Sequence, residues 1–384
     1  MKTIWINFLH AYQPPSQDAE VLAKVADECY RPLIALAKKY PSWNFTFNIS
    51  GVLTELLFQN GFGDIIDGLR FLAERGQIEW VSSAMYHPIL PLIPAKQALR
   101  QIDLNDEINR RILGASYSPK GFFCPEMAVD DTVLDLIARK GYKWAILDEY
   151  SAASPVSPAL FYKHKSGLSL VFRNRQVSKT YVPFTILGDL KKNNIAPYII
   201  SATDAELYGH HHRDHEDLLE KVLSSDRVST WTIGRYLCAP FQTREIKIQP
   251  SSWETTPEDF KEKNSFPLWK DPKNIFHQKL WSFAQVMCKI LDKYPQDPNL
   301  DSAQFHLDRG LASCAFWWCS AKRPSPFCPI TWNPDEIEKG LLELVKVSRS
   351  LGTLPSSVKI RHEKSYHTLK MLLWQRHWEE FGKK

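Results

Sequence analysis

The stretch from residue 121 to residue 147, GFFCPEMAVDDTVLDLIARKGYKWAIL, decides the fold class of this chain. Its first four residues are apolar and predict a short strand. Residues 130–140 have helical apolar spacing, and Gly141 follows at a position where helices commonly end. Residues 142–147 predict a second strand. A strand, a helix and a strand in this order indicate two parallel strands joined by a crossover.

The same alternation extends in both directions along the chain. Further strands are predicted at residues 2–8, 43–49, 77–83, 196–202 and 228–233, with 169–173 as another strand or an inserted hairpin. Further helices are predicted at 18–40, 51–75 with a break near Gly61, 95–113, and 212–223 with Asp214 as its N-cap. Seven or eight strands separated by helices suit a barrel or a doubly wound sheet, and the strand count favours a barrel with an incomplete strand set.

Beyond about residue 250 the sequence changes character. Residues 249–274 are rich in Pro and Trp and predict a long ordered loop. Helices are predicted after this loop at 276–290, 300–321, from Asn333-Pro334 to the residue before Gly352, and 359–381. We therefore expect two domains, a barrel over residues 1–262 and a helical bundle over residues 263–384.

Composition and charge exclude several classes of function. The chain has 384 residues, a net charge of +5 and 44% hydrophobic residues, as expected for a folded globular protein. The chain has no run of five like charges, so a nucleic-acid partner is not indicated. No window approaches the roughly 18 apolar residues of a membrane span, and the apolar N-terminal stretch is too short for a signal sequence. Seven cysteines without CxxC spacing predict buried free thiols and a cytoplasmic location.

Polar residues gather just after the predicted strands, where a barrel enzyme has its active site. The candidates are His10, Tyr12 and Gln13 after the first strand, Glu79 and His87 in and after the third, Glu126 after the fourth, Asp148 and Glu149 after the fifth, and Asp204, Glu206 and His210 after residue 202.

Two of these carboxylates suit the chemistry of a glycosidic bond, which needs one acid to protonate the leaving oxygen and a second to attack or to activate water. Glu126 follows the apolar residues 122–124 and Pro125, and Asp204 ends an apolar strand. Apolar surroundings allow the pKa of a carboxyl to be tuned. The alternatives are a loop salt bridge for Glu126 and a helix cap for Asp204. Charge and spacing do not distinguish the attacking group.

Histidines and tryptophans offer further candidates. Four histidines lie close together at His210, His211, His212 and His215, but no second group of metal ligands lies nearby, so a structural or substrate-binding role is favoured and no metal is expected. Trp253 lies in a polar loop and is a candidate for stacking on sugar rings. Trp317 has helical spacing with its neighbours, and core packing and sugar stacking both fit it.

Five segments resemble, in order, the sequence regions of glycoside hydrolase family 57. They are HAYQPP at 10–15, GQIEWVSSAMYHPILP at 76–91, GFFCPEMAVD at 121–130, TDAELYGHH at 203–211 and FWW at 316–318. The resemblance implies an incomplete (β/α)7 barrel followed by a C-terminal helical bundle that completes the active-site wall. It also implies a retaining hydrolase or glucanotransferase that acts on α-glucans without a metal or cofactor.

The resemblance also implies roles for individual residues. Glu126 corresponds to the nucleophile and Asp204 to the general acid/base. Substrate-binding positions are expected at His10, Gln13, Glu79, His87, Glu206, His210, Trp253 and Trp317. Two residues depart from the family pattern, because Tyr12 replaces a second histidine and Cys314 replaces an acid.

Two other functions fit parts of the sequence. A metal-dependent deacetylase or mannosidase on a related barrel needs Asp and His ligands after the first strand, and HAYQPP has no Asp. A non-catalytic glycan-binding homologue fits the two departures, but Glu126 and Asp204 both being present argues against it.

Overall fold

The computed structural model describes residues 2–192, 195–323 and 330–381. They form two compact units. The first unit consists of residues up to Gln13, Gln17–Met85 and Ile102–Trp253, and the second of Pro14–Ser16, Tyr86–Gln101 and the residues from Glu254 onward. The predicted domain boundary between residues 262 and 263 remains a prediction.

The first unit is built on a row of seven parallel strands, in the order β7-β5-β4-β3-β2-β1-β8. These strands are β1 (Thr3–Ala11), β2 (Phe45–Ile49), β3 (Ile78–Ser82), β4 (Gly121–Phe123), β5 (Trp144–Asp148), β7 (Ser169–Arg173) and β8 (Tyr198–Asp204). In the described part of the chain no strand pairing joins β7 to β8, so the barrel stays open between them. The predicted incomplete (β/α)7 barrel is confirmed.

Three shorter strands extend this sheet. Strand β6 (Phe161–Lys163) pairs antiparallel with β7, and β10 (Thr243–Glu245) pairs with β6. Strand β9 (Val228–Trp231) pairs with the first half of β1. Residues 169–173 are therefore both a strand of the barrel and one arm of a hairpin.

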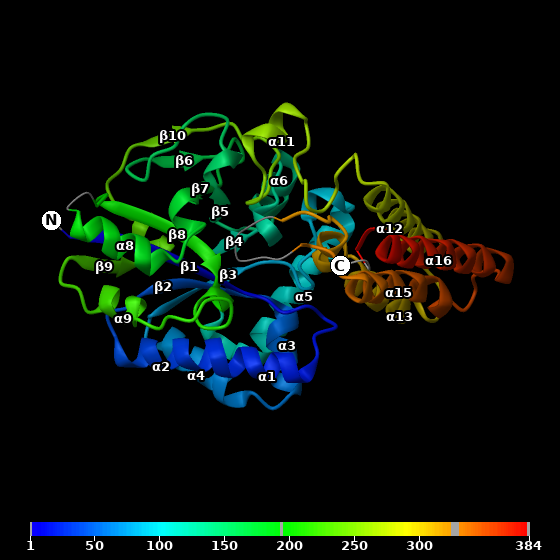
Figure 1. The fold of residues 1–384 in the computed structure, drawn as a ribbon, viewed down its shortest axis with the longest axis horizontal. Helices are drawn as coiled ribbons and strands as arrows, with labels where there is room; N and C mark the ends of the chain where they lie inside the picture. The colour runs from blue at the N-terminus through cyan, green and yellow to red at the C-terminus, as the bar shows by residue number, and fades with distance from the viewer. Residues whose placement is uncertain (1, 193–194, 324–329, 382–384) are drawn as a thin grey trace. The chain divides into compact units, whose positions relative to one another are not determined.

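Helices follow most of the parallel strands, and several lie along the outer face of β1 and β2 (Figure 1). The α-helices of this unit are α1 (Ala19–Val25), α2 (Arg31–Lys39), α3 (Gly51–Gln59), α4 (Gly63–Glu74), α6 (Asp131–Arg139), α7 (Arg175–Ser178), α8 (Val182–Lys191), α9 (Leu218–Leu223) and α10 (Ile233–Tyr236), and α5 (Ala95–Leu113) contributes residues to both units. The π-helical segment η1 (Ala26–Tyr30) joins α1 to α2.

One predicted helix starts in the wrong place. Helix α9 begins at Leu218, six residues after the predicted start at His212, and its N-cap is Asp217 in a left-handed conformation with φ of 52°. Asp214 still satisfies the helix end, because its carboxylate accepts the N–H groups of Leu218 and Leu219 at 2.8 and 2.9 Å.

The barrel interior is filled by alternate residues of each strand, as the two-residue period of a strand requires. Apolar side chains from β1, β3, β4, β5, β7 and β8 form one buried cluster, which includes Ile6, Phe8, Val81, Phe123, Ile146, Val171, Ile200 and Ala202. By the same alternation, the next inward positions at the carboxyl ends are His10 on β1, Asp148 on β5, Arg173 on β7 and Asp204 on β8. The strand register therefore sends these four polar side chains to the rim of the barrel.

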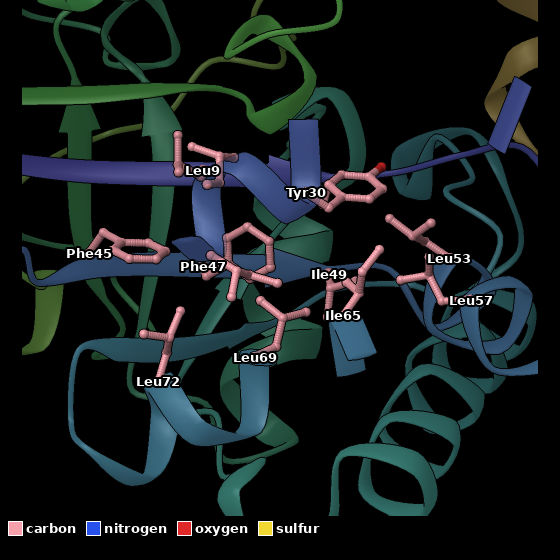
Figure 2. A pocket seen from close by; sticks show the side chains of 13 residues that line it. Leu9, Tyr30, Phe45, Phe47, Ile49, Leu53, Leu57, Ile65, Leu69 and Leu72 are labelled. Carbon is pink, nitrogen blue, oxygen red and sulfur yellow. The ribbon is translucent and has the colours of Figure 1, made fainter. Parts of the chain in front are cut away.

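The opposite face of β1 and β2 packs against helices α2, α3 and α4 around a small apolar cavity (Figure 2). Leu9, Phe45 and Phe47 from the strands face Leu57 and Leu69 from the helices. The cavity holds about 20 Å³, little more than the space of one water molecule. We regard it as imperfect packing and assign it no ligand.

The second unit is mainly helical, with α15 (Pro334–Ser350) packed against its neighbours α13 (Leu300–Gly310), α14 (Ser313–Trp318), α16 (Ser356–Arg376) and α12 (Ile275–Lys293). The short helix α11 (Pro257–Lys261) precedes them. The single helix predicted at 300–321 is wrong. The chain breaks after Gly310, which packs tightly against Leu344, and Ala312 forms a β-bridge with Pro88.

No helix in the described ranges has the length and apolar character needed to cross a bilayer. Six of the seven cysteines lie in these ranges and are free thiols, whereas Cys328 lies outside them. Four of the six are buried as predicted, but Cys238 is exposed and Cys314 is partly exposed.

Candidate active site

His10 and Asp204 are neighbours across the β1–β8 pairing. The register places His10 opposite Asp204 on one side and opposite Asn48 of β2 on the other. The Nδ1 atom of His10 lies 2.7 Å from Oδ1 of Asn48, and its ring lies 4.5 Å from the ring of Phe123. Burial lowers the pKa of His10 to about 4 despite the hydrogen bond to Asn48, so the imidazole is neutral at neutral pH. The imidazole of His10 is therefore a polar but uncharged neighbour of Asp204.

Glu126 occupies a strained turn at the end of β4. Its backbone is left-handed, with φ of 59° and ψ of 18°, a conformation that costs a residue with a side chain about 1–2 kcal/mol. The turn is held by the N–H of Met127, which donates to Cys124 O at 2.7 Å, and by the N–H of Ala128, which donates to Pro125 O at 2.9 Å. Such strain is typical of functional positions, because it fixes the direction of a side chain.

Trp253 holds this carboxylate from a distant part of the chain. Its indole Nε1 donates to Oε2 of Glu126 at 2.9 Å, and its backbone N–H donates to Glu126 O at 3.0 Å. The indole ring also lies 5.9 Å from the ring of Phe123 and 6.4 Å from that of His10. These contacts bring Glu126 and three aromatic rings together at the carboxyl-terminal rim.

We expect Trp253→Phe to lower kcat/KM by about 10- to 100-fold, because a hydrogen bond to an ionised carboxylate contributes about 1.5–3 kcal/mol. The phenyl ring keeps most of the apolar contact with Phe123 and His10 but has no N–H group. The measurement is initial-rate kinetics on a maltooligosaccharide, a member of the substrate class that the resemblance implies. Trp231→Phe, a change of the same kind on β9, is the control. Equal kinetics for Trp253→Phe and the parent protein would show that this hydrogen bond does not serve the reaction.

Glu206 fastens the segment after β1 to the end of β8. Its side chain is 3% exposed, and Oε1 accepts hydrogen bonds from the N–H of Tyr12 at 3.2 Å, from Gln13 Nε2 at 3.4 Å and from the hydroxyl of Tyr30. Burial, and to a lesser extent the nearby charge of Asp204, raises the pKa of Glu206 to about 7. The structure thus brings together three predicted site residues, Gln13, Glu206 and Asp204.

Glu206→Gln is expected to change how stability depends on pH. An ordinary pKa of 4.5 in the unfolded chain means that this carboxyl ionises there first, so native stability falls as pH rises from about 4.5 to about 7. Glutamine removes this contribution, which is worth about 3 kcal/mol at most, while its amide oxygen can still accept hydrogen bonds from these donors. Urea unfolding of both proteins across this pH range measures the difference. Parallel stability curves would contradict the raised pKa.

Glu79 lies deeper in the barrel than the other candidates. It pairs in register with Thr46, two residues before Asn48, the partner of His10. Its Oε2 accepts hydrogen bonds from the Thr46 hydroxyl at 3.1 Å and the Gly234 N–H at 2.8 Å. A Cβ at position 234 would lie 2.2 Å from the other carboxylate oxygen, so a larger residue there would displace this carboxylate. These contacts tie β3 to β2 and α10, and the predicted substrate contact of Glu79 remains a prediction.

His210 contacts Glu28 of η1, with 2.7 Å between Nδ1 of His210 and Oε2 of Glu28. This hydrogen bond lowers the pKa of the Glu28 carboxyl. The preceding Gly209 has φ of 123°, and a Cβ there would lie 1.9 Å from the backbone oxygen of Glu28. Within the described residues no three His, Cys, Asp or Glu side chains form a group that could hold a metal ion.

His87 and Trp317 belong to the second unit. His87 is buried, with its Nδ1 3.1 Å from the hydroxyl of Ser313 at the start of α14. Trp317 is partly exposed on the same helix and lies edge to face against Trp318 at 4.6 Å. His87 thus contacts the first residue of α14, the helix that carries Trp317.

Sequence reasoning missed Asn48, Tyr30 and Arg173. Asn48 and Arg173 interrupt apolar strands at inward-facing positions, which is a signal that the sequence carries. Tyr30 lies in a helical segment, and nothing in the sequence indicates that its hydroxyl meets Glu206.

Comparison with known proteins identifies the family of this chain. Residues 5–226 match the model of glycosyl hydrolase family 57, which is more than half of the chain. The chain belongs to glycosyl hydrolase family 57. The predicted family is thereby confirmed, and four of the five sequence segments, at 10–15, 76–91, 121–130 and 203–211, lie within the matched residues.

Similar proteins of known name include an alpha-amylase and a 4-alpha-glucanotransferase. The chain is 25% identical over 339 residues to an alpha-amylase of Pyrococcus horikoshii, covering 80% of this chain and 53% of the relative. It is 25% identical over 270 residues to a 4-alpha-glucanotransferase of Thermococcus litoralis, covering 64% of this chain and 40% of the relative. The chain thus spans about half the length of these relatives or less.

The fold is shared along nearly the whole chain with a solved family 57 structure. The branching enzyme of Thermococcus kodakaraensis matches with a TM-score of 0.69 at 15% identity, covering 96% of this chain and 95% of that one. At this identity the likeness concerns the fold alone.

Proposed function

We propose that this chain is a retaining enzyme of α-glucan metabolism, a hydrolase or a glucanotransferase, with Glu126 as nucleophile and Asp204 as general acid/base. The observation that carries the proposal is the placement of both carboxylates at the carboxyl ends of parallel strands, Glu126 after β4 and Asp204 at the end of β8. Active sites of αβ barrels lie at this end. The names of the two family 57 relatives support α-glucans as the substrate class.

The proposed reaction has two steps through a covalent intermediate. In the first, a carboxylate oxygen of Glu126 bonds to the anomeric carbon as the glycosidic carbon–oxygen bond breaks, and Asp204 gives its proton to the departing oxygen. In the second, Asp204 takes a proton from water or a sugar hydroxyl, whose oxygen bonds to the anomeric carbon as the ester to Glu126 breaks. Two inversions give net retention of configuration.

The environments of the two carboxyls support this division of roles. Glu126 receives the indole N–H of Trp253, and a hydrogen-bond donor favours the ionised form that a nucleophile needs. Asp204 lies beside the buried Glu206, whose raised pKa is caused in part by the Asp204 charge. The two carboxyls repel each other when both are ionised, so the titration of one depends on the charge of the other.

Incubation with maltoheptaose tests the proposal and separates hydrolysis from transfer. Hydrolysis produces a net gain of reducing ends, whereas transfer redistributes chain lengths without such a gain. Proton NMR of the first product formed is expected to show the α-anomer. An initial β-anomer would exclude the retaining mechanism, and no turnover of maltoheptaose, starch or glycogen would exclude the substrate class.

We further propose that the protein works in a reducing compartment such as the cytoplasm. The six free cysteines in the described ranges support this, because exposed thiols such as Cys238 persist under reducing conditions. Mass spectrometry of protein extracted with an alkylating reagent present is expected to find Cys238 alkylated, and a disulfide there would contradict the proposal.

A further inference from the structure

Arg173 is a buried cation at the end of β7 that contacts both halves of the candidate active site. Its side chain is 4% exposed. Nη1 donates to the backbone oxygen of Ala202 at 2.9 Å, and Nη2 donates to the backbone oxygen of Trp253 at 3.3 Å. Its guanidinium carbon also lies 5.2 Å from the centroid of the Trp253 indole ring, in cation–π range.

Each of these contacts leads to one of the two candidate carboxylates. Ala202 lies two residues before Asp204 on β8, so its carbonyl belongs to the strand end that presents the acid/base. Trp253 donates from both its indole and its backbone to Glu126. One side chain therefore connects the segment that carries Asp204 with the residue that holds Glu126.

The open side of the barrel explains why such a connection is needed. Strands β7 and β8 are the two ends of the parallel row and do not pair with each other in the described structure. In a closed barrel, a ladder of backbone hydrogen bonds would set the distance between neighbouring strand ends. Here the Arg173 guanidinium and the N–H of Asn174, which donates to Ile200 O at 2.7 Å, cross the opening.

Asp148 holds this guanidinium in place. It is fully buried, pairs in register with Arg173, and its Oδ2 accepts from Arg173 Nε at 2.8 Å. The other oxygen, Oδ1, lies 2.9 Å from Nη1 of Arg175. Arg175 stacks over Tyr150 instead of reaching the site, with 4.7 Å between its guanidinium carbon and the ring centroid. Two cations thus share one carboxylate, but only Arg173 contacts Ala202 and Trp253 among the contacts described.

We propose that Arg173 is a positioning residue that sets the relative placement of Glu126 and Asp204 across the open side of the barrel, through Trp253 and the end of β8. This inference rests on the proposed function of the two carboxylates. Among the contacts described, Arg173 touches Ala202 and Trp253, the neighbours of the two carboxylates in the fold. Its loss is therefore expected to lower kcat and to change KM little, because the binding surface remains while the geometry of attack is disturbed.

The test compares Arg173→Met with Arg175→Met. Both variants remove one of the two cations that share Asp148, so they change the buried charge alike and differ in the contacts to Ala202 and Trp253. On maltoheptaose we expect Arg173→Met to lose about 100-fold in kcat with KM within about threefold of the parent. Arg175→Met should keep kcat within about fivefold. Arg173→Lys, which keeps the charge beside Asp148 but has no planar fork to span both carbonyls, should lose nearly as much as Arg173→Met.

A second readout does not depend on turnover. The protein is labelled with 5-fluorotryptophan, and the fluorine resonance of Trp253 is assigned by its absence in Trp253→Phe. We expect this resonance to move in Arg173→Met and Arg173→Lys and to stay in place in Arg175→Met. If the parent protein does not turn over maltoheptaose, the proposed function fails, and the fluorine spectra still decide whether Arg173 positions Trp253.

Three outcomes would overturn the inference: an unmoved Trp253 resonance in Arg173→Met, a kcat for that variant within fivefold of the parent, or equal effects of Arg173→Met and Arg175→Met. Equal effects of the two variants would show that the loss of a positive charge beside Asp148 accounts for the whole decrease in kcat. If Arg173→Met does not fold, Arg173→Lys carries the same comparison.

Discussion

Glu126→Gln is expected to abolish turnover of α-glucans, with a loss of at least about 10⁴-fold in kcat, while the protein keeps its fold. The amide is almost the same size as the carboxylate, so the turn after β4 and the contacts with Trp253 can remain. An amide oxygen, however, is a poor nucleophile and cannot form the ester intermediate. The measurement is kcat on maltoheptaose, with circular dichroism and the melting temperature as the check on folding.

A chemical trap makes this assignment specific to one residue. Incubation of the parent protein with a 5-fluoro-α-glucosyl fluoride is expected to leave a stable ester, and peptide mass spectrometry should place it on Glu126. Glu149→Gln is the matched control, since it makes the same change after the next strand, where the carboxylate accepts the N–H of Arg175. Normal turnover by Glu126→Gln, or an ester on another residue, would show that the nucleophile is wrongly assigned.

The second large effect is expected at Asp204. Asp204→Ala should lower kcat/KM on maltoheptaose by about 10³-fold, because general acid/base catalysis typically contributes 10²- to 10⁴-fold. The loss should depend on the leaving group. On 4-nitrophenyl α-maltoside the nitrophenolate departs without a proton, so the first step should stay fast and the ester to Glu126 should accumulate.

Rescue by azide tests the general-base role of Asp204 directly. As a small anion azide attacks the intermediate without needing a general base, so adding azide to Asp204→Ala should restore turnover and give the α-glycosyl azide. Glu206→Gln, which changes the neighbouring carboxyl, should retain the leaving-group behaviour of the parent. Equal losses of Asp204→Ala on both substrates, with no response to azide, would rule out the acid/base role.

Many elements of this protein follow from local pattern. Helix α5 has the predicted bounds, because its apolar stripe is long and regular. The break near Gly61 is also confirmed, because Gly61 has φ of 81°, which residues with a side chain rarely adopt. Local pattern misplaced the start of α9 and the end of α13. The end of α13 follows the tight packing of Gly310 on the distant Leu344, whereas at α9 the carboxylate of Asp214 caps a helix that begins four residues later.

By itself, the sequence predicted the parallel strands, favoured an incomplete barrel over a doubly wound sheet, and placed the two carboxylates after strand ends. These features depend on residue spacing along short segments, and a strand's period of two residues places Asp204 inward once Ile200 and Ala202 are inward. The tertiary structure alone decided what surrounds those carboxylates. Trp253 reaches Glu126 across 127 positions of sequence, and Arg173 reaches Ala202 and Trp253 through space. Burial and hydrogen bonding of this kind depend on where the chain returns, and no local spacing encodes that return.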